Sequence, residues 1–141
     1  MLSFGNALLY NAVNAEVYKT SLDPCAGFLH DPAGARNSLA LDIAEMFRPF
    51  IIDDLILVTD HQRIMNQGHF DKDEFKCYLN REGKIKWIGE IKKRMEHLVD
   101  YSPLQRPVSA REQIKLQCYK LIQYLDGEEH EYEPIDFQNW G

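Results

Sequence analysis

The sequence lacks the short motifs that mark several large enzyme classes. It has no glycine-rich phosphate-binding loop and no nucleophile elbow, so kinases, nucleotide switches and serine hydrolases have no support. Its three cysteines, Cys25, Cys77 and Cys118, are far apart and form no CxxC pair, which is typical of reduced thiols. No apolar run reaches the roughly 18 residues of a membrane span, and no secretory leader is present. We therefore expect a cytoplasmic protein without membrane contact.

Positive charge is also scarce, and much of it lies in one place. The 141-residue chain has a formal net charge of -6, whereas most DNA-binding domains are basic. Its acids concentrate near the end of the chain, in residues 126–136. A basic run precedes them, made of Lys84, Lys86, Lys92, Lys93 and Arg94. This run is either a solvated helix face or a surface that meets a DNA duplex, and the sequence leaves both open.

Apolar residues recur at steps of three and four through most of the chain, which predicts helices. The expected helices cover residues 1–22, 38–48, 50–60, 87–99 and 109–127. Residues 70–79 are expected to hold a short helix or a turn-rich segment. No segment shows a strand alternation of useful length. We therefore predict an all-α fold, with a helical domain of the catalytic type over residues 1–126 and an acidic tail over residues 127–141.

A loop histidine followed by a helix with carboxylates is the feature best suited to chemistry. Ser38 is a good N-cap for a helix whose residues are mostly apolar, as in a buried helix. Asp42, Glu45 and Arg48 interrupt that helix at steps of three, which we interpret as one stripe along its surface. His30 lies one short loop before the helix. The chain could therefore fold back and place an imidazole beside the carboxylates.

Two interpretations of this stripe stay open on the residues alone. Carboxylates that share an apolar setting repel each other, and a divalent cation held between them and His30 would relieve that repulsion. A mixed set of imidazole and carboxylate ligands suits Mn2+ or Mg2+, whereas structural zinc sites favour thiolates or more imidazoles. The alternative is a salt bridge from Arg48 to Asp42 or Glu45, with His30 as an ordinary loop residue.

Two segments of this region resemble the signature of a known family. LDPCAGFLH at residues 22–30 and RNSLALDIAEMFRP at residues 36–49 are similar to the motifs of the CRISPR-associated integrase that captures new spacers. The resemblance implies that His30 and Glu45 bind the catalytic metal ion. Asp42 is the nearby second acid of that site.

The same resemblance assigns roles to two further residues. It implies that Arg48 contacts the phosphate or stabilises the charge that develops on it. It also implies that Tyr10, on the first helix, approaches the metal site. From the residues alone, the better-supported interpretation of Tyr10 is a core tyrosine with a hydrogen-bonded hydroxyl.

In function, the resemblance implies a DNA integrase and endonuclease that depends on Mn2+ or Mg2+. Such an enzyme joins the 3′-hydroxyl of a spacer DNA to a phosphodiester of the CRISPR repeat, and it cuts branched DNA. The partners implied are spacer precursor and repeat DNA, a small companion Cas protein and a second copy of the enzyme.

Two departures from the family pattern bear on this chain. We expect it to lack the family's β-rich N-terminal domain and the third metal ligand, a glutamate upstream of the first helix. The isolated chain should then be monomeric, bind Mn2+ weakly and react slowly or not at all. The alternative is a helical interaction or DNA-binding module without catalysis, which fits the acidic net charge at least as well.

Overall fold

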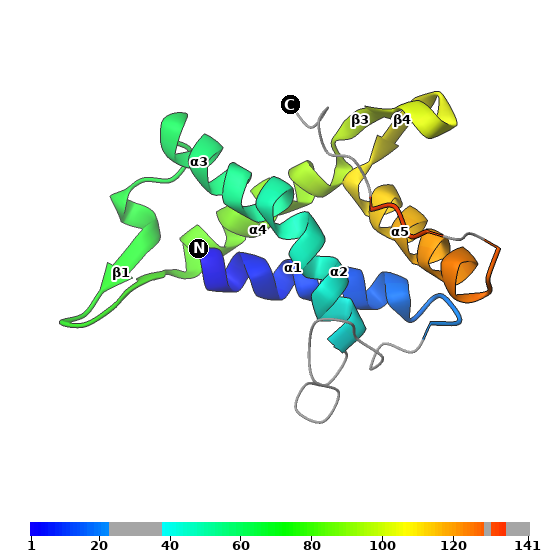
Figure 1. Ribbon diagram of the computed structural model, residues 1–141. Helices are drawn as coiled ribbons and strands as arrows, with labels where there is room; N and C mark the ends of the chain where they lie inside the picture. Colours follow the sequence, from blue (N-terminus) through cyan, green and yellow to red (C-terminus); the bar gives the residue numbers. More distant parts are fainter. Residues whose placement is uncertain (23–37, 129–130, 135–141) are drawn as a thin grey trace.

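The computed structural model describes residues 1–22, 38–128 and 131–134 (Figure 1). Its α-helices and one π-helix are α1 (Leu2–Val17), α2 (Ser38–Arg48), η1 (Pro49–Asp53), α3 (Asp54–His61), α4 (Arg81–Glu96) and α5 (Ala110–Leu125). Two 3-10 turns, η2 (Gln67–His69) and η3 (Ser102–Leu104), lie between them. None of the helices in these ranges is long and apolar enough to cross a lipid bilayer.

Two antiparallel hairpins show that the all-α prediction is wrong. Strand β1 (Phe70–Lys72) pairs with β2 (Cys77–Leu79), and β3 (Leu98–Tyr101) pairs with β4 (Arg106–Ser109). Strands of three or four residues are too short for an alternating pattern to stand out from the surrounding sequence. The fold is therefore mainly helical with two small two-stranded sheets.

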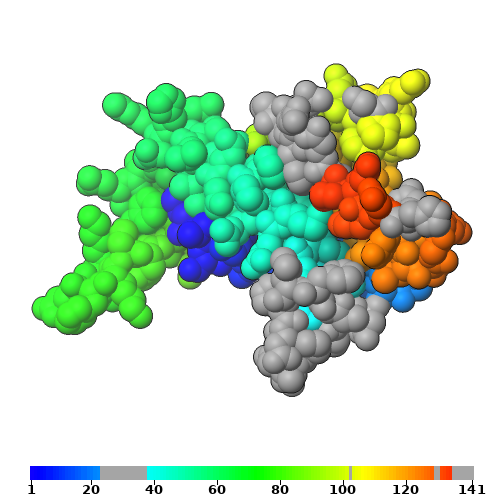
Figure 2. Space-filling model, viewed as in Figure 1, coloured from blue at the N-terminus to red at the C-terminus, as the bar shows by residue number. Residues whose placement is uncertain are grey.

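The β1–β2 hairpin replaces the short helix or turn-rich segment expected over residues 70–79. Asp73 shapes its turn, because Oδ1 accepts hydrogen bonds from the backbone N–H groups of Phe75 (2.9 Å) and Lys76 (2.7 Å). An Asx turn of this kind satisfies backbone groups locally. The residues of this region, drawn in green, form a protrusion from the body of the molecule (Figure 2). Phe75 is 89% exposed there.

The second hairpin ends α4 earlier than the sequence predicts. The apolar spacing of the helix continues to Val99, but α4 stops at Glu96 and His97 is extended (φ -61°, ψ 131°). Val99 instead pairs with Val108 of β4, and both side chains are buried. Burial within the hairpin therefore outweighs the local helical pattern, because the partner strand lies outside the window that a periodicity count examines.

Polar caps determine where α4 and α5 begin. Asn80 Oδ1 accepts a hydrogen bond from the backbone N–H of Gly83 (2.9 Å), and Ser109 Oγ accepts one from Glu112 (3.2 Å). Each bond satisfies one of the N–H groups that a helix leaves without an internal partner. The predicted start of the last helix at Ser109 is confirmed.

Helix α1 lies at the centre of the helical core. It packs against α2, α5, η1 and α4 (Figure 1). Leu9, Val13 and Val17, at steps of four, are buried, which confirms the prediction of a central helix. The helix is shorter than expected, since it ends at Val17 and Thr20 Oγ1 then accepts a hydrogen bond from the N–H of Leu22 (3.2 Å).

A four-residue repeat runs through the continuous rod formed by α2, η1 and α3. Its members are all buried: Ile43, Phe47, Ile51, Leu55 and Thr59. In an α-helix a step of four residues advances about 40° beyond one turn, so a repeat of this length would wind away from the core. A π-helical turn holds more residues, and η1 offsets this drift. The π-helix therefore keeps one face of the rod against the core.

Candidate active site

A pocket opens where α1 packs against α2. Both helices contribute to its lining, which consists of Asn6, Leu9, Tyr10, Leu41, Ala44, Glu45 and Arg48. The cavity has a volume of about 190 Å3. Three of the predicted site residues, Tyr10, Glu45 and Arg48, therefore meet at one place.

This pocket has an apolar floor and a charged rim. Leu9 and Ala44 are buried, Tyr10 is half-buried, and Glu45 and Arg48 are exposed. Glu45 and Arg48 lie three residues apart on α2, so one carboxylate and one guanidinium border the same opening. The pocket thus presents charges of both signs to a ligand that enters from solvent.

Arg48 also contacts an acid outside the pocket. Its Nε lies 3.7 Å from Asp53 Oδ2 in η1, and the two side chains are 48% and 42% exposed. An ion pair of this length and exposure contributes little to stability. Arg48 can therefore turn to an incoming anion at small cost.

Asn6 is a pocket residue that the sequence did not single out. It lies four residues before Tyr10, on the same face of α1. Its Oδ1 is buried and has no hydrogen-bond partner within the described part of the chain, which is costly for an amide oxygen. The spacing to Tyr10 is the signal that could have identified it.

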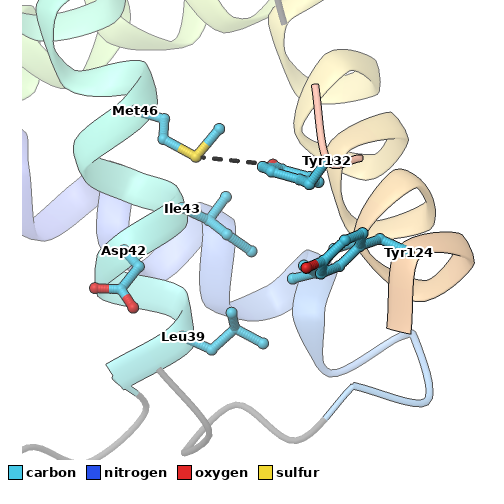
Figure 3. Close-up of a pocket in the computed structure, with 7 residues that line it drawn as sticks. Leu39, Asp42, Ile43, Met46, Tyr124 and Tyr132 are labelled. Carbon is cyan, nitrogen blue, oxygen red and sulfur yellow. Dashed lines mark hydrogen bonds between the residues drawn. The ribbon is translucent and has the colours of Figure 1, made fainter. Parts of the chain in front are cut away.

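Asp42 lines a different cavity, of about 320 Å3, between α2 and α5 (Figure 3). The other lining residues are mostly apolar: Leu39, Ile43, Met46, Leu121, Tyr124 and Tyr132. Asp42 is only 5% exposed, and its carboxylate is directed away from the two tyrosine rings (Figure 3). The stripe expected from steps of three is therefore divided, because Glu45 and Arg48 face α1 while Asp42 does not line that pocket.

The donor groups at the α1–α2 pocket suit a hard divalent ion, although they are few. Over residues 1–22, 38–128 and 131–134, no cluster of three or more His, Cys, Asp or Glu side chains is placed to hold a metal ion. The pocket does offer the carboxylate of Glu45 and the unpartnered Oδ1 of Asn6. Mg2+ and Mn2+ prefer such oxygen ligands. The predicted imidazole ligand, His30, lies outside the described residues.

Arg94 of α4 fixes the backbone immediately beyond the pocket. Its Nε and Nη2 donate hydrogen bonds to the carbonyl oxygen of Phe50, at 3.2 and 3.1 Å. Nη2 also donates to Asp54. The Arg94 side chain is only 15% exposed, so these bonds are shielded from water. Because Phe50 follows Arg48 by two residues, this contact restrains the segment that carries Arg48.

Two solved structures share the fold that holds this pocket. A Cas1 protein from Thermotoga maritima has a TM-score of 0.83 and 40% identity, covering 90% of this chain and 39% of its own. A casposase bound to an integration product has a TM-score of 0.82 and 26% identity, covering 96% of this chain and 40% of its own. The fold therefore places the chain in the structural class that contains this Cas1 protein and this casposase.

The family follows from the sequence comparison. The model of the family described as CRISPR associated protein Cas1 matches residues 1–93, which include every residue of the pocket, and the chain belongs to this family. The resemblance inferred from the two motifs is thus confirmed.

Named relatives give the extent of the match. The CRISPR-associated endonuclease Cas1 of Clostridium perfringens is 44% identical over 135 residues, 96% of this chain and 41% of that protein. CRISPR-associated endonuclease Cas1 3 of Thermodesulfovibrio yellowstonii is 37% identical over 140 residues, 99% of this chain and 42% of that protein. The chain spans about two fifths of the length of these relatives.

Proposed function

We propose that this chain carries part of the reacting site of a DNA integrase and endonuclease of CRISPR adaptation. The reaction joins a DNA 3′-hydroxyl to a phosphodiester, and with water as nucleophile the same site cuts DNA. The observation that carries the proposal is the meeting of Tyr10, Glu45 and Arg48 in one pocket. The names of the relatives, which are endonucleases, support it, as does the integration product bound by the casposase.

We assign Mn2+ or Mg2+ to the Glu45 side of this pocket, with His30 as a further ligand and Asp42 acting on the ion through its charge. When bound, the ion would polarise the phosphodiester and favour deprotonation of the attacking hydroxyl. Glu45 supplies a carboxylate at the pocket rim. Asp42 lines a separate cavity. It would therefore influence the ion from the neighbouring surface of the same helix.

The remaining pocket residues act on the substrate directly. Arg48, which is half-exposed and only loosely paired, binds a non-bridging phosphate oxygen and stabilises the charge that grows there. Tyr10 donates a hydrogen bond from its hydroxyl to the phosphate or to the attacking oxygen, and Asn6 Oδ1 accepts a hydrogen bond within the pocket. Both helices are fixed by core packing, so these groups are held in place before the substrate arrives.

Partners and location follow from this activity and belong to the same proposal. The DNA partners are the spacer precursor, the repeat and branched DNA. A small companion Cas protein and a second copy of the complete enzyme would assemble with the regions of the relatives that this chain does not span. We place the reaction in the cytoplasm.

A second candidate is a helical DNA-binding or interaction module that performs no reaction. It is favoured by the net charge of -6 and by the α1–α2 pocket, where the described residues supply a single carboxylate. Under this proposal the chain keeps the fold and binds DNA or a partner, but strand transfer is absent with or without Mn2+ or Mg2+.

Strand transfer by a chimera distinguishes the two candidates. The matching 135 residues of the Clostridium perfringens relative are replaced by this chain, and joining of a labelled 3′-hydroxyl DNA to a repeat duplex is measured with Mn2+. The first proposal expects metal-dependent product that Glu45→Gln reduces by about 100-fold. Glu74→Gln, in the exposed β1–β2 turn, is the matched control and should retain activity. Equal activity of the two variants would refute the assignment of Glu45.

A further inference from the structure

Helix α4 concentrates the positive charge of an acidic chain. Six of the 16 lysine and arginine residues lie in α4, together with three acids, while the whole chain has a net charge of -6. A local excess of this size on one helix attracts polyanions even when the total charge is negative.

The structure divides the basic run into internal and external cations. Arg94 is used internally, since it holds Phe50 and Asp54. Lys93 is 75% exposed and pairs with Glu90 at 2.8 Å. Lys86 and Lys92 are exposed and have no ion pair within the described residues.

Gly89 is the common neighbour of three of the outward cations. On a helix surface, a residue touches those three and four positions away, which for Gly89 are Ile85, Lys86, Lys92 and Lys93. Ile85 is 63% exposed, and the three lysines are exposed as well. Three ammonium groups and one aliphatic side chain therefore surround a position that has no side chain.

The space above Gly89 is open. A Cβ atom added there would meet no atom of the described residues within 4 Å, so packing within this part of the chain does not explain the glycine. Glycine in a helix interior lowers stability by roughly 1 kcal/mol relative to alanine. A gap of this kind lets an external backbone approach the helix closely.

We propose that this notch, formed by Gly89 and its four neighbours, binds the phosphate backbone of a DNA duplex. The surrounding lysines match closely spaced phosphates, and glycine admits the backbone to the helix surface. The pocket lies between α1 and α2, neither of which contributes to the notch. The notch would therefore hold a DNA segment away from the reacting phosphodiester. This inference rests on the proposed function only in taking DNA as the partner.

Equilibrium binding of the 141-residue chain to a fluorescent 30-base-pair duplex, in EDTA, tests the proposal without any reaction. The double variant Lys86→Ala/Lys92→Ala should weaken binding to every duplex sequence and lower the slope of log K against log salt by about two. Lys72→Ala/Lys76→Ala, on the β1–β2 hairpin, removes the same charge and should have a much smaller effect. Equal losses in the two double variants, or no binding by the wild-type chain at low salt, would overturn the proposal.

Gly89→Gln separates a role in binding from a role in folding. It should raise Tm by roughly 2–4 °C, because glycine is a poor helix former, and yet weaken duplex binding. Unchanged binding would refute close approach at this position. Normal duplex binding by Lys86→Ala/Lys92→Ala, together with loss of strand transfer in the Glu45→Gln chimera, would contradict the notch and leave the proposed reacting site standing.

Discussion

The hydroxyl of Tyr132 donates a hydrogen bond to Oε1 of Gln117, a residue of α5 with no exposed surface. The same hydroxyl lies 4.0 Å from Sδ of Met46 on α2 (Figure 3). Tyr132 therefore joins α5 to the helix that carries Glu45, although it comes from the segment predicted as an acidic tail. Residues 135–141 of that segment lie outside the described residues, and the domain boundary at residue 126 stays a prediction.

Removing this hydroxyl should cost stability. Tyr132→Phe leaves the buried side-chain carbonyl of Gln117 without its donor, which is expected to lower the free energy of unfolding by about 1–3 kcal/mol. Urea unfolding followed by circular dichroism measures the loss. Tyr119→Phe, on the exposed side of α5, is the matched control and should stay within about 0.5 kcal/mol of the wild type. A loss in both variants would show that the Gln117 bond is not responsible.

Alkaline pH should destabilise the fold through the same region. Burial raises the pKa of the Cys118 thiol to about 11, with a smaller effect from the nearby charge of Glu16. Burial likewise raises the pKa of Tyr132 to about 12, with a contribution from Cys118. Because both folded-state values lie above the unfolded ones, the stabilisation is complete below about pH 9. It is lost as pH rises through 11 and 12.

Unfolding free energies measured between pH 8 and pH 12 test this expectation. Tyr132→Phe should flatten the part of the profile above pH 10, and Cys118→Ala the part between pH 9 and pH 11. Profiles of both variants parallel to that of the wild type would contradict the assigned groups.

The contact between Arg94 and the π-helix should be important for stability. Arg94→Gln removes two charge-assisted hydrogen bonds to the Phe50 carbonyl, and the expected loss is about 2 kcal/mol or more. Arg81→Gln, at the exposed start of α4, should have little effect. Similar melting temperatures for the two variants would mean that the Phe50 carbonyl finds another donor.

Glu45 should matter for chemistry and not for folding. Its side chain is exposed at the pocket rim, so Glu45→Ala should change the unfolding free energy by no more than about 0.5 kcal/mol in chelator. Under the salt-bridge interpretation the same change would leave the charge of Arg48 without its partner. A loss of about 3 kcal/mol would therefore support that alternative.

Two glycines should respond in opposite directions to alanine. A Cβ at Gly5 would lie 3.1 Å from Cγ2 of Ile52 and 3.3 Å from Nε1 of Trp87, and both neighbours are fully buried. Gly5→Ala should therefore destabilise by about 1–3 kcal/mol. Gly89→Ala, with open space above it, should instead stabilise by about 1 kcal/mol. Thermal unfolding of the two variants tests this expectation. A higher stability of Gly5→Ala would show that Ile52 can move.

Local signals predicted that the helices exist, though not all of their bounds, because such signals depend on near neighbours. Ser109 begins α5 as its cap spacing indicates, and Leu9 and Val13 are buried on α1 as their steps of four indicate. The hairpins were not predicted because each strand depends on a partner strand. Val99 is held by pairing with Val108, which lies outside the helical pattern that precedes Val99.

Only part of the site was predicted correctly from the sequence, and the reason is geometric. A step of three residues turns an α-helix by about 300°, so Asp42 and Glu45 point about 60° apart. That difference is enough for them to line separate cavities, one toward α5 and one toward α1. Only the packing of α2 between its neighbours decides which cavity each residue meets, and this is not written in the local sequence.

The rod from Ser38 to His61 is sensitive to its length more than to its composition. Its buried face tolerates exchange among aliphatic residues, because only a period of four must be kept. Loss or gain of a single residue within Pro49–Asp53 would rotate everything beyond it by about 100°. Leu55 and Thr59 would then face water, and polar residues would face the core. Natural variation in this segment should therefore consist of substitutions, with insertions and deletions placed outside the rod.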